Sequence, residues 1–399
     1  MDQTQNNWTR KTILFLASQC ITLFGSMIVQ MAIIWYVTLK TSSGGWVAAF
    51  TICAYLPQFL ISFFAGVWAD RYSHKKLILL SDGIIAIATL ILFVAIPMIS
   101  MDNLLLSSLL AVSIIRAIGA GVQMPAVNAV IPRLVPEEHL MKYNGMNATM
   151  QSIVQFISPA VAGMVLSLGT FRAALFIDIL TALLGMSLLS CVLLPKQEAT
   201  HETVSVLSEI KAGVRYSFSD KMIGNVLKLY GLFILLCVPA GFMAALLVSR
   251  VYGEAYWYLS AVELVGFAGM MLGGVLMGVW GGFQSRVKTL AVGLLILSIM
   301  TIGMGLSPYF LLYLVMMFVY SIALTMIQTA TTTIIQENAE SSMLGRVFGV
   351  MGAMYSGFLP IGMAIFGPLA DMIPLQWIMV GCGIALGFLI ILLQSSETN

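Results

Sequence analysis

Charged residues are scarce in this chain. They make up 9% of its 399 residues, against roughly a quarter in soluble globular proteins, whereas 60% of the residues are hydrophobic. Water therefore cannot be the main solvent of the folded chain. The formal net charge of +2 is also small, and nucleic-acid-binding proteins need a basic surface, so we expect no nucleic-acid partner.

The residue types that serve metal sites, redox sites and enzymes are few as well. The 3 histidines are scattered with no ligand spacing, and the 5 cysteines all fall inside apolar stretches without the pattern of a metal or redox motif. The chain has no Gly-x-x-x-x-Gly-Lys-Ser/Thr loop of the kind that binds ATP. We therefore expect no metal, no cofactor and no enzymatic activity. Energy for any work must come from an ion gradient, unless the process is passive.

Long apolar stretches dominate instead. A helix needs about 20 apolar residues to cross the hydrocarbon layer of a membrane. Twelve stretches of approximately this length are present, and each predicts a transmembrane helix. They cover residues 12–37, 44–68, 77–99, 103–124, 141–168, 171–194, 222–248, 255–281, 287–306, 309–333, 345–371 and 374–394. The predicted fold class is therefore an all-α integral membrane protein with twelve transmembrane helices.

One long polar connection, residues 195–221, separates the first six stretches from the last six. The predicted organisation is an N-terminal six-helix half over residues 1–194, a cytoplasmic linker over 195–221 and a C-terminal six-helix half over 222–399. Five residues of the linker recur at helical spacing and predict a short amphipathic helix on the membrane surface, with a flexible linker as the alternative. These residues are Val204, Leu207, Lys211, Val214 and Phe218.

A short basic turn occurs twice in the chain. The first copy begins with Gly66-Val67-Trp68 after the second apolar stretch, and the second begins with Gly278-Val279-Trp280, 212 residues later (278 − 66). Ser73 of the first copy matches Ser285 of the second. A basic turn between membrane spans that repeats at half the chain length is typical of a transporter that arose by duplication.

Lysine and arginine are unevenly divided between the two sides of the predicted membrane topology. If both termini are cytoplasmic, the outside loops hold three of the 19 Lys and Arg residues, namely Lys40, Arg172 and Arg250. One more, Arg116, lies within a span, and all the others fall in cytoplasmic segments. Because cytoplasmic loops carry an excess of Lys and Arg, this distribution predicts that both termini are cytoplasmic.

The first basic turn resembles the signature of the major facilitator superfamily, which has a Gly, then Asp-Arg, then a basic cluster. The matching residues are Gly66, Asp70, Arg71, Lys75 and Lys76. The turn differs from the signature where Ser73 replaces the usual Gly and His74 the usual Arg. The resemblance implies the major facilitator fold, in which twelve helices form two six-helix halves.

Two further segments are similar to the bacterial drug-exporter branch of that superfamily, which includes macrolide efflux proteins and enterobactin exporters. They are the run from Arg116 through Gly119, Gly121, Pro125-Ala126 and Ile131-Pro132 to Val135-Pro136-Glu137-Glu138, and the segment Gly345-Arg346-Val347-Phe348. This resemblance implies a multi-pass protein of the bacterial inner membrane that exports amphiphilic, macrolide-like drugs by proton antiport and alternating access. We expect a monomer whose partners are the lipid bilayer, protons and a small amphiphilic substrate.

Two other functions stay open at this point. One is export of a siderophore or transport of another small molecule, although a bulky and often anionic siderophore would favour a strongly basic cavity, which Arg116 alone does not supply. The other is a membrane sensor that transports nothing. A sensor would be expected to lack the basic-turn residues such as Asp70 and Arg71, which this chain retains.

Ionisable residues inside the spans are the candidates for proton coupling, because each is costly in a membrane unless it is paired, hydrated or protonated. Glu263 lies in the eighth span without a charged neighbour in sequence, and the alternative is a salt bridge or contact with water. Asp178 lies in the sixth span, where pairing with Arg172 or a polar neighbour is the alternative. Arg116 lies midway down the fourth span, where a local structural pair is as good an interpretation as a proton relay. Asp82, in the first turn of the third span, fits a cytoplasmic charge network or a helix-terminus interaction.

The basic turn is a candidate cytoplasmic gate. Asp70 can meet the positive N-terminus of the eleventh span near Gly345, and this contact would break when the halves rock. Gly282 stands in the second copy where Asp70 stands in the first, so we predict that the gate is asymmetric.

Proline and glycine mark two possible helix bends, and the resemblance places some polar and aromatic residues at a central cavity. Pro159 with Gly163 resembles a fifth-span signature of exporters, and Pro360 marks a comparable bend in the eleventh span. Packing without any role in export is the alternative for these residues.

In the superfamily fold, spans one, four, seven and ten face the cavity, and ordinary helix packing is the alternative for their residues. The candidates are Gln19, Gln30, Trp35, Tyr36, Gln123, Tyr230, Tyr320 and Gln328.

Overall fold

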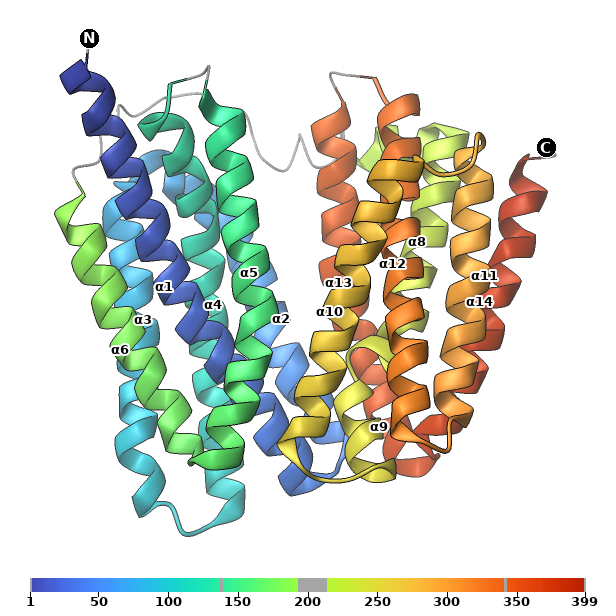
Figure 1. Ribbon diagram of the computed structural model, residues 1–399, viewed down its shortest axis with the longest axis horizontal. Coiled ribbons are helices and arrows are strands. Elements are labelled where there is room, and N and C mark those ends of the chain that lie inside the picture. The colour runs from blue at the N-terminus through green and yellow to red at the C-terminus, as the bar shows by residue number, and fades with distance from the viewer. Residues whose placement is uncertain (1, 137–138, 193–213, 341–342, 398–399) are drawn as a thin grey trace. The chain divides into compact units, whose positions relative to one another are not determined.

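The structure is a computed structural model that describes residues 2–136, 139–192, 214–340 and 343–397 (Figure 1). Throughout these residues the regular elements are helices, and the predicted all-α class is confirmed. The helices are α1 (Asp2–Thr41), α2 (Gly44–Arg71), α3 (His74–Ala95), a 3₁₀ turn (Ile96–Met98), α4 (Asp102–Leu134), α5 (Leu140–Leu168), α6 (Phe171–Cys191), α8 (Lys221–Gly241), α9 (Ala244–Val251), α10 (Tyr256–Trp280), α11 (Arg286–Leu306), α12 (Phe310–Asn338), α13 (Leu344–Met372) and α14 (Leu375–Glu397).

The helices account for the twelve predicted spans. Within the described residues, 11 segments are long and apolar enough to cross a membrane, and α14 adds a shorter apolar helix over Leu375–Ile391. Most of the linker that was predicted to hold an amphipathic helix, including Val204, Leu207 and Lys211, lies outside the described residues. At its end, residues 214–219 are helical, and Val214 and Phe218 are exposed.

The seventh span differs from the continuous helix that the sequence predicts over 222–248. It consists of α8, which ends at Gly241, and α9, which begins at Ala244. Pro239 lies in the last turn of α8 and cannot donate a backbone hydrogen bond. Beyond it, the backbone nitrogens of Phe242 and Met243 both donate to the carbonyl of Val238, at 2.9 and 3.3 Å. The helix therefore ends and restarts within one apolar segment.

The repeat that the basic turns indicate extends to the helices around them. Helices α2 and α10 begin at Gly44 and Tyr256, and α3 and α11 begin at His74 and Arg286, so both pairs are 212 residues apart (256 − 44 and 286 − 74). Ser285 caps α11, because its side chain accepts a hydrogen bond from the backbone nitrogen of Lys288 at 3.2 Å.

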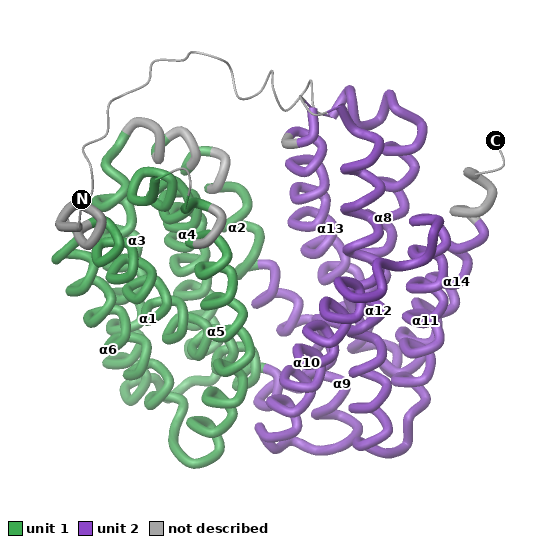
Figure 2. Tube along the Cα trace, turned by 45° about the horizontal axis from the view of Figure 1, so that its top comes forward, with its two compact units in different colours: residues 1–37, 53–201 green, residues 38–52, 202–399 purple. Residues whose placement is uncertain are grey.

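The chain forms two compact units (Figure 2). Unit 1 contains residues 1–37 and 53–201, and unit 2 contains residues 38–52 and 202–399. Helix α2 thus contributes its first residues to unit 2 and the rest to unit 1. Pro57 lies inside α2, one turn beyond this change.

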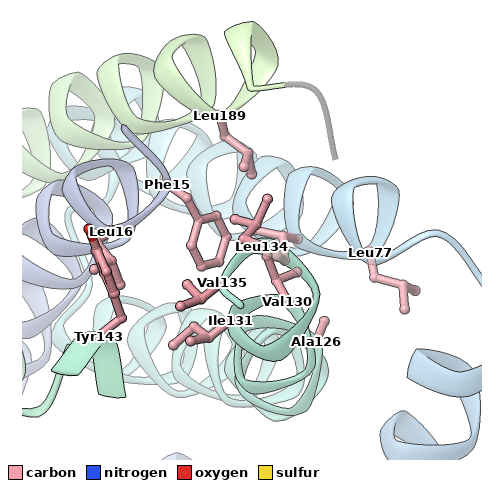
Figure 3. Packing of buried hydrophobic residues seen from close by; sticks show 11 residues of the cluster. Phe15, Leu16, Leu77, Ala126, Val130, Ile131, Leu134, Val135, Tyr143 and Leu189 are labelled. Atoms are coloured by element: carbon pink, nitrogen blue, oxygen red, sulfur yellow. The ribbon is translucent and has the colours of Figure 1, made fainter. Parts of the chain in front are cut away.

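Each unit has its own apolar core. In unit 1, buried side chains of α1, α3, α4, α5 and α6 form one cluster, and Figure 3 shows Phe15 beside Leu134 and Val135. In unit 2, α8, α12 and α13 share a cluster, and α10 packs closely against α12. A Cβ atom at Gly269 of α10 would lie 2.4 Å from the carbonyl oxygen of Phe318 of α12, so only glycine permits this approach.

Candidate functional site

A buried ion pair joins α4 to α6 inside unit 1. Nη1 of Arg116 lies 2.5 Å from Oδ2 of Asp178, and the two side chains are only 9% and 3% exposed. Two of the three residues that the sequence singles out for proton coupling are therefore partners of each other. Arg172, the other candidate partner of Asp178, instead places its guanidinium 4.5 Å from the centre of the Phe93 ring.

Two hydroxyl groups complete the surroundings of this ion pair. Arg116 donates to Oγ1 of Thr89 on α3 at 2.6 Å, and to Oγ of Ser26 on α1 at 2.9 Å. Thr89 Oγ1 also lies 3.0 Å from Oδ2 of Asp178. The guanidinium thus binds residues of α1, α3 and α6 while it is anchored on α4. A charge inside a membrane span is tolerated when it is paired and hydrogen-bonded in this way.

A second buried carboxyl lies on the same pair of helices. Gln123 of α4 donates from Nε2 to Oδ1 of Asp82 on α3, at 2.7 Å. Asp82 is 5% exposed, and its other oxygen, Oδ2, has no hydrogen-bond partner. The described residues include no cation paired with Asp82. The charge network or helix-terminus interaction that its position near the basic turn predicts stays a prediction.

Glu263 of α10, the third proton-coupling candidate, is partly exposed and makes no hydrogen bond or ion pair within the described part of the chain. Its carboxyl interacts electrostatically with the hydroxyl of Tyr313 on α12. The Tyr313 side chain is fully buried, and its hydroxyl has no hydrogen-bond partner. The close packing of α10 against α12 thus brings the Glu263 carboxyl and the Tyr313 hydroxyl near each other in unit 2.

Sequence reasoning did not find a further polar cluster in unit 2, centred on Asp371 at the end of α13. Its carboxylate accepts hydrogen bonds from the backbone nitrogens of Gly44 and Gly45, at 2.6 and 2.8 Å, and from Ser43 Oγ at 2.8 Å. An anion is favoured at this place because it meets the free backbone N–H groups and the positive end of the α2 dipole. The Ser43-Gly44-Gly45 turn was the signal available in the sequence, since it marks a helix start that needs a cap.

Arg250, at the end of α9, neutralises this carboxylate. It donates from Nη2 to Asp371 Oδ1 at 2.9 Å, from Nη1 to the carbonyl of Ala370 at 2.6 Å, and from Nε to the carbonyl of Ser42 at 3.0 Å. The Arg250 and Asp371 side chains are 25% and 34% exposed, so water screens their attraction in part.

The two copies of the basic turn make different polar contacts. In the first copy, Lys75 donates to the carbonyls of Ser190 and Val192, at 2.7 and 2.8 Å, where α6 ends and a cation is favoured. In the second copy, Arg286 pairs with Glu337 of α12, with Nε and Oε1 3.1 Å apart. The acidic partner of the second turn therefore comes from another helix. It does not occupy position 282, which matches Asp70 in the repeat.

The remaining gate residues are less fully described. Lys76 is exposed. The side chains of Asp70 and Arg71, as well as Gly66 and Gly345 beyond their helical backbone, lie outside the described residues. The contact between Asp70 and the start of α13 thus remains a prediction.

The residues predicted to form helix bends or to line the cavity differ in how deeply they are buried. Pro159 and Gly163 of α5 and Pro360 of α13 are buried, and both helices continue through them. Of the cavity candidates, Gln19, Trp35, Tyr230 and Tyr320 are buried, Gln30, Tyr36 and Gln123 are partly buried, and Gln328 is exposed. Tyr36 stacks on Phe171 with their ring centres 4.9 Å apart. Their roles at a substrate cavity stay predictions.

Known proteins similar to this chain include two kinds of bacterial exporter. Macrolide efflux protein A of Streptococcus pyogenes is 30% identical over 373 residues, which is 92% of this chain and 91% of that protein. Enterobactin exporter EntS of Citrobacter koseri is 28% identical over 326 residues, which is 77% of this chain and 72% of that protein.

Solved structures of transporters share the fold. The nucleoside transporter NupG matches with a TM-score of 0.67 and 14% identity, covering 99% of this chain and 100% of that one. A POT family transporter in complex with 5-aminolevulinic acid matches with a TM-score of 0.73 and 12% identity, covering 97% and 96%. The sequence model of the Major Facilitator Superfamily matches residues 15–362. With twelve apolar spans, a half-chain repeat and this match over most of its length, the chain belongs to the major facilitator superfamily, a family of membrane transporters.

Proposed function

We propose that this protein is a secondary active transporter that exports amphiphilic, macrolide-like molecules from the bacterial cytoplasm in exchange for protons. The observation that carries this proposal is the buried Arg116–Asp178 pair, in a chain that is similar to macrolide efflux protein A over 92% of its length. Ionisable groups within membrane spans are costly and mark ion pathways in transporters.

The surroundings of the pair suggest how a proton could act on it. Protonation of Asp178 would remove the negative charge that holds the Arg116 guanidinium toward α6. Arg116 would then be free to change its contacts with Thr89 and Ser26, and with them the packing of α1, α3 and α4. A contact that depends on a proton can bias the equilibrium between inward-facing and outward-facing states. Glu263 is a second candidate proton carrier, because it is a carboxyl inside a span.

The orientation of the chain follows from the distribution of Lys and Arg. Both termini lie in the cytoplasm, and two six-helix halves, residues 1–194 and 222–399, alternate access across the inner membrane. The linker over 195–221 joins the two halves on the cytoplasmic side. The protein acts as a monomer.

The first basic turn is proposed as the cytoplasmic gate. Its members are Gly66, Asp70, Arg71, Lys75 and Lys76. Lys75 is hydrogen-bonded to the end of α6 and so fixes the start of α3, which leaves Asp70 at the end of α2 to form and break the gate contact. Pro159, Gly163 and Pro360 would allow the helices to bend as access changes.

Siderophore export is the second candidate function. The similarity to the enterobactin exporter EntS over 77% of this chain favours it. Among the described residues of unit 1, Arg116 is the buried arginine, and Asp178 already neutralises it, which leaves little positive charge for an anionic ligand there. We therefore rank macrolide-like substrates first.

Drug accumulation tests the proposal directly. A radiolabelled macrolide is supplied to an efflux-deficient bacterium that expresses the wild-type protein, the Asp178→Asn variant or the control Asp102→Asn, with and without a protonophore. Asp102 is an exposed carboxyl in the first turn of α4, outside the buried cluster. The amount of each variant in the membrane is measured by immunoblot.

The expected result is low accumulation in the wild-type and Asp102→Asn strains, which rises to the empty-vector level with the protonophore and in Asp178→Asn. Unchanged accumulation in the wild-type strain would refute macrolide export, and a labelled catecholate siderophore would then be assayed. Export by Asp178→Asn at the wild-type rate would refute the role of the ion pair in proton coupling.

A further inference from the structure

Helices α3 and α4 carry two polar contacts at matching heights. Arg116 of α4 contacts Thr89 of α3, and Gln123 of α4 contacts Asp82 of α3. The two contacts are seven residues apart on each helix, and they follow opposite chain directions because the helices are antiparallel. Seven residues are close to two helical turns, so both contacts lie on the face where the helices meet, about 10 Å apart along the axis.

An apolar layer separates the two levels. A Cβ atom at Gly119 of α4 would lie 2.6 Å from Cγ1 of Ile85 on α3, so the helices touch directly between the polar contacts. Because the layer between the two levels is apolar, it screens charge only weakly, so Asp82 lies within reach of the charges of Arg116 and Asp178. The two carboxyls are therefore separate sites that sense each other's charge.

The charged groups around Asp82 are few. Arg116 on α4 and Asp178 on α6 face the same interior. The other charged groups on these helices lie near their ends: His74, Lys75 and Lys76 at the start of α3, Asp102 and Arg133 in the first and last turns of α4, and Arg172 in the first turn of α6. Arg10 and Lys11 precede the buried part of α1.

Among the described residues of unit 1, the buried charged side chains are thus Arg116, Asp82 and Asp178, and the imidazole of His74 is buried at the start of α3. Asp178 is paired with Arg116 and receives a hydroxyl contact from Thr89, so it is the carboxyl that bears the negative charge. Asp82 has one hydrogen bond from a neutral amide and one oxygen without a partner. An ionised carboxylate with such surroundings is strongly disfavoured, whereas a protonated one is neutral.

We propose that Asp82 is a proton-carrying residue that exchanges ionisation with Asp178, through the shared charge of Arg116. For the arrangement seen in the structure, this proposal assigns the proton to Asp82 and the negative charge to Asp178. When Asp178 takes up a proton, Arg116 loses its counterion, and its positive charge then favours ionisation of Asp82. Asp82 releases its proton, so that one proton enters, one leaves, and the cluster stays neutral.

The position of Asp82 gives this exchange a direction. It lies closer than Thr89 to the start of α3, which is the cytoplasmic end in the proposed topology. Asp82 would therefore release protons toward the cytoplasm after Asp178 has taken them up deeper in the membrane. This inference rests on the proposed proton-coupled function, but its first test does not depend on transport.

Infrared difference spectroscopy of the purified full-length protein in lipid nanodiscs provides that test. A protonated carboxyl has a C=O stretching band that shifts in D₂O. At neutral pH the wild-type spectrum minus the Asp82→Asn spectrum should contain such a band, because the contribution of Glu263, the other proposed carrier, is common to both proteins and cancels. Asp178→Asn should lack this Asp82 band, because the unpaired Arg116 would keep Asp82 ionised.

A double variant separates this mechanism from a structural role. In Arg116→Gln/Asp178→Asn the cation is gone, so Asp82 should regain its proton and the band should return. This variant also covers the case in which Asp178→Asn alone does not fold. Identical carboxyl bands in the wild-type protein and Asp82→Asn, or the absence of the Asp82 band from the double variant, would overturn the proposal.

Transport supplies the second readout. With a substrate that the wild-type protein exports, Asp82→Asn should lose the protonophore-sensitive export, and Asp82→Glu should restore part of it because the carboxyl is regained. Full export by Asp82→Asn would refute its role as a proton carrier. If the wild-type protein exports no macrolide, the proposed substrate fails, while the infrared result still decides the protonation of Asp82.

Discussion

Asp371 of α13 caps the first turn of α2, because its Oδ1 accepts a hydrogen bond from the backbone nitrogen of Gly44 at 2.6 Å. The two helices are also in backbone contact at this point. A Cβ atom at Gly44 would lie 2.3 Å from the carbonyl oxygen of Gly367, and one at Gly367 would lie 2.3 Å from Cβ of Ala48. The start of α2 is thus held to unit 2 by charge, by hydrogen bonds and by close packing.

Removing the charge of Asp371 should weaken this attachment. In Asp371→Asn the cap and the pair with Arg250 become weaker, and we expect the free energy of unfolding to fall by about 1 kcal/mol because the site is partly exposed. Differential scanning fluorimetry of the protein in detergent should record this as a Tm lowered by about 2–4 °C. Glu254→Gln, an exposed change in the same part of the chain, is the control. An equal Tm for both variants would contradict the capping role.

Close packing at Gly367 predicts a larger effect. Gly367→Ala places a methyl group against Ala48 and the backbone of Gly44, so either α2 or α13 must shift. We expect destabilisation by about 1–3 kcal/mol, typical of overpacking. Gly274→Ala on α10 is the matched control, because a Cβ atom there meets nothing within 4 Å. Its Tm should stay the same or rise, since alanine is the better helix former.

The buried ion pair predicts a strong non-additive effect on stability. Asp178→Asn or Arg116→Gln alone leaves one polar group of the pair uncompensated, and we expect each to lower the free energy of unfolding by about 3–5 kcal/mol. The double variant removes both charges and should be less destabilised than the sum of the single changes. Thermal unfolding of all four proteins gives the coupling energy as a double-mutant cycle. Additive losses would mean that the two side chains act independently.

Glu263 is the second proposed proton carrier, and its test uses transport. In Glu263→Gln the side chain keeps its size but cannot ionise, so protonophore-sensitive macrolide export should be lost while the protein still reaches the membrane. Glu263→Asp, which retains a carboxyl, should keep part of the activity. Wild-type export by Glu263→Gln would assign proton coupling to unit 1 alone.

The gate proposal predicts that the two basic turns differ in importance. Asp70→Asn should abolish export with normal membrane expression, because the turn would lose the charge that the gate proposal pairs with the start of α13. Glu337→Gln breaks the exposed pair with Arg286 in the second turn and should reduce export little, since such pairs contribute about 0–1 kcal/mol. Accumulation assays with matched immunoblots compare the two. Wild-type export by Asp70→Asn would remove the gate.

Local properties of the sequence were enough to predict the helices, the repeat and the family. A membrane span needs an unbroken apolar stretch of about 20 residues, and this requirement can be checked one segment at a time. The predicted starts at residues 44 and 287 fall within one residue of α2 and α11. The seventh span was predicted as one helix because the whole segment is apolar, and hydropathy does not show that Pro239 lacks a backbone N–H. In the structure α8 ends two residues after this proline.

Only the tertiary structure decided which polar side chains are partners. Arg116 and Asp178 are 62 positions apart, and Gly44 and Asp371 are 327 apart, so neither contact has a signature at helical spacing. The sequence identified Arg116, Asp178 and Glu263 because a charge in an apolar stretch is visible by itself. Their partners depend on how the helices are rotated and packed against each other, and that arrangement is set by the whole apolar core rather than by any one segment.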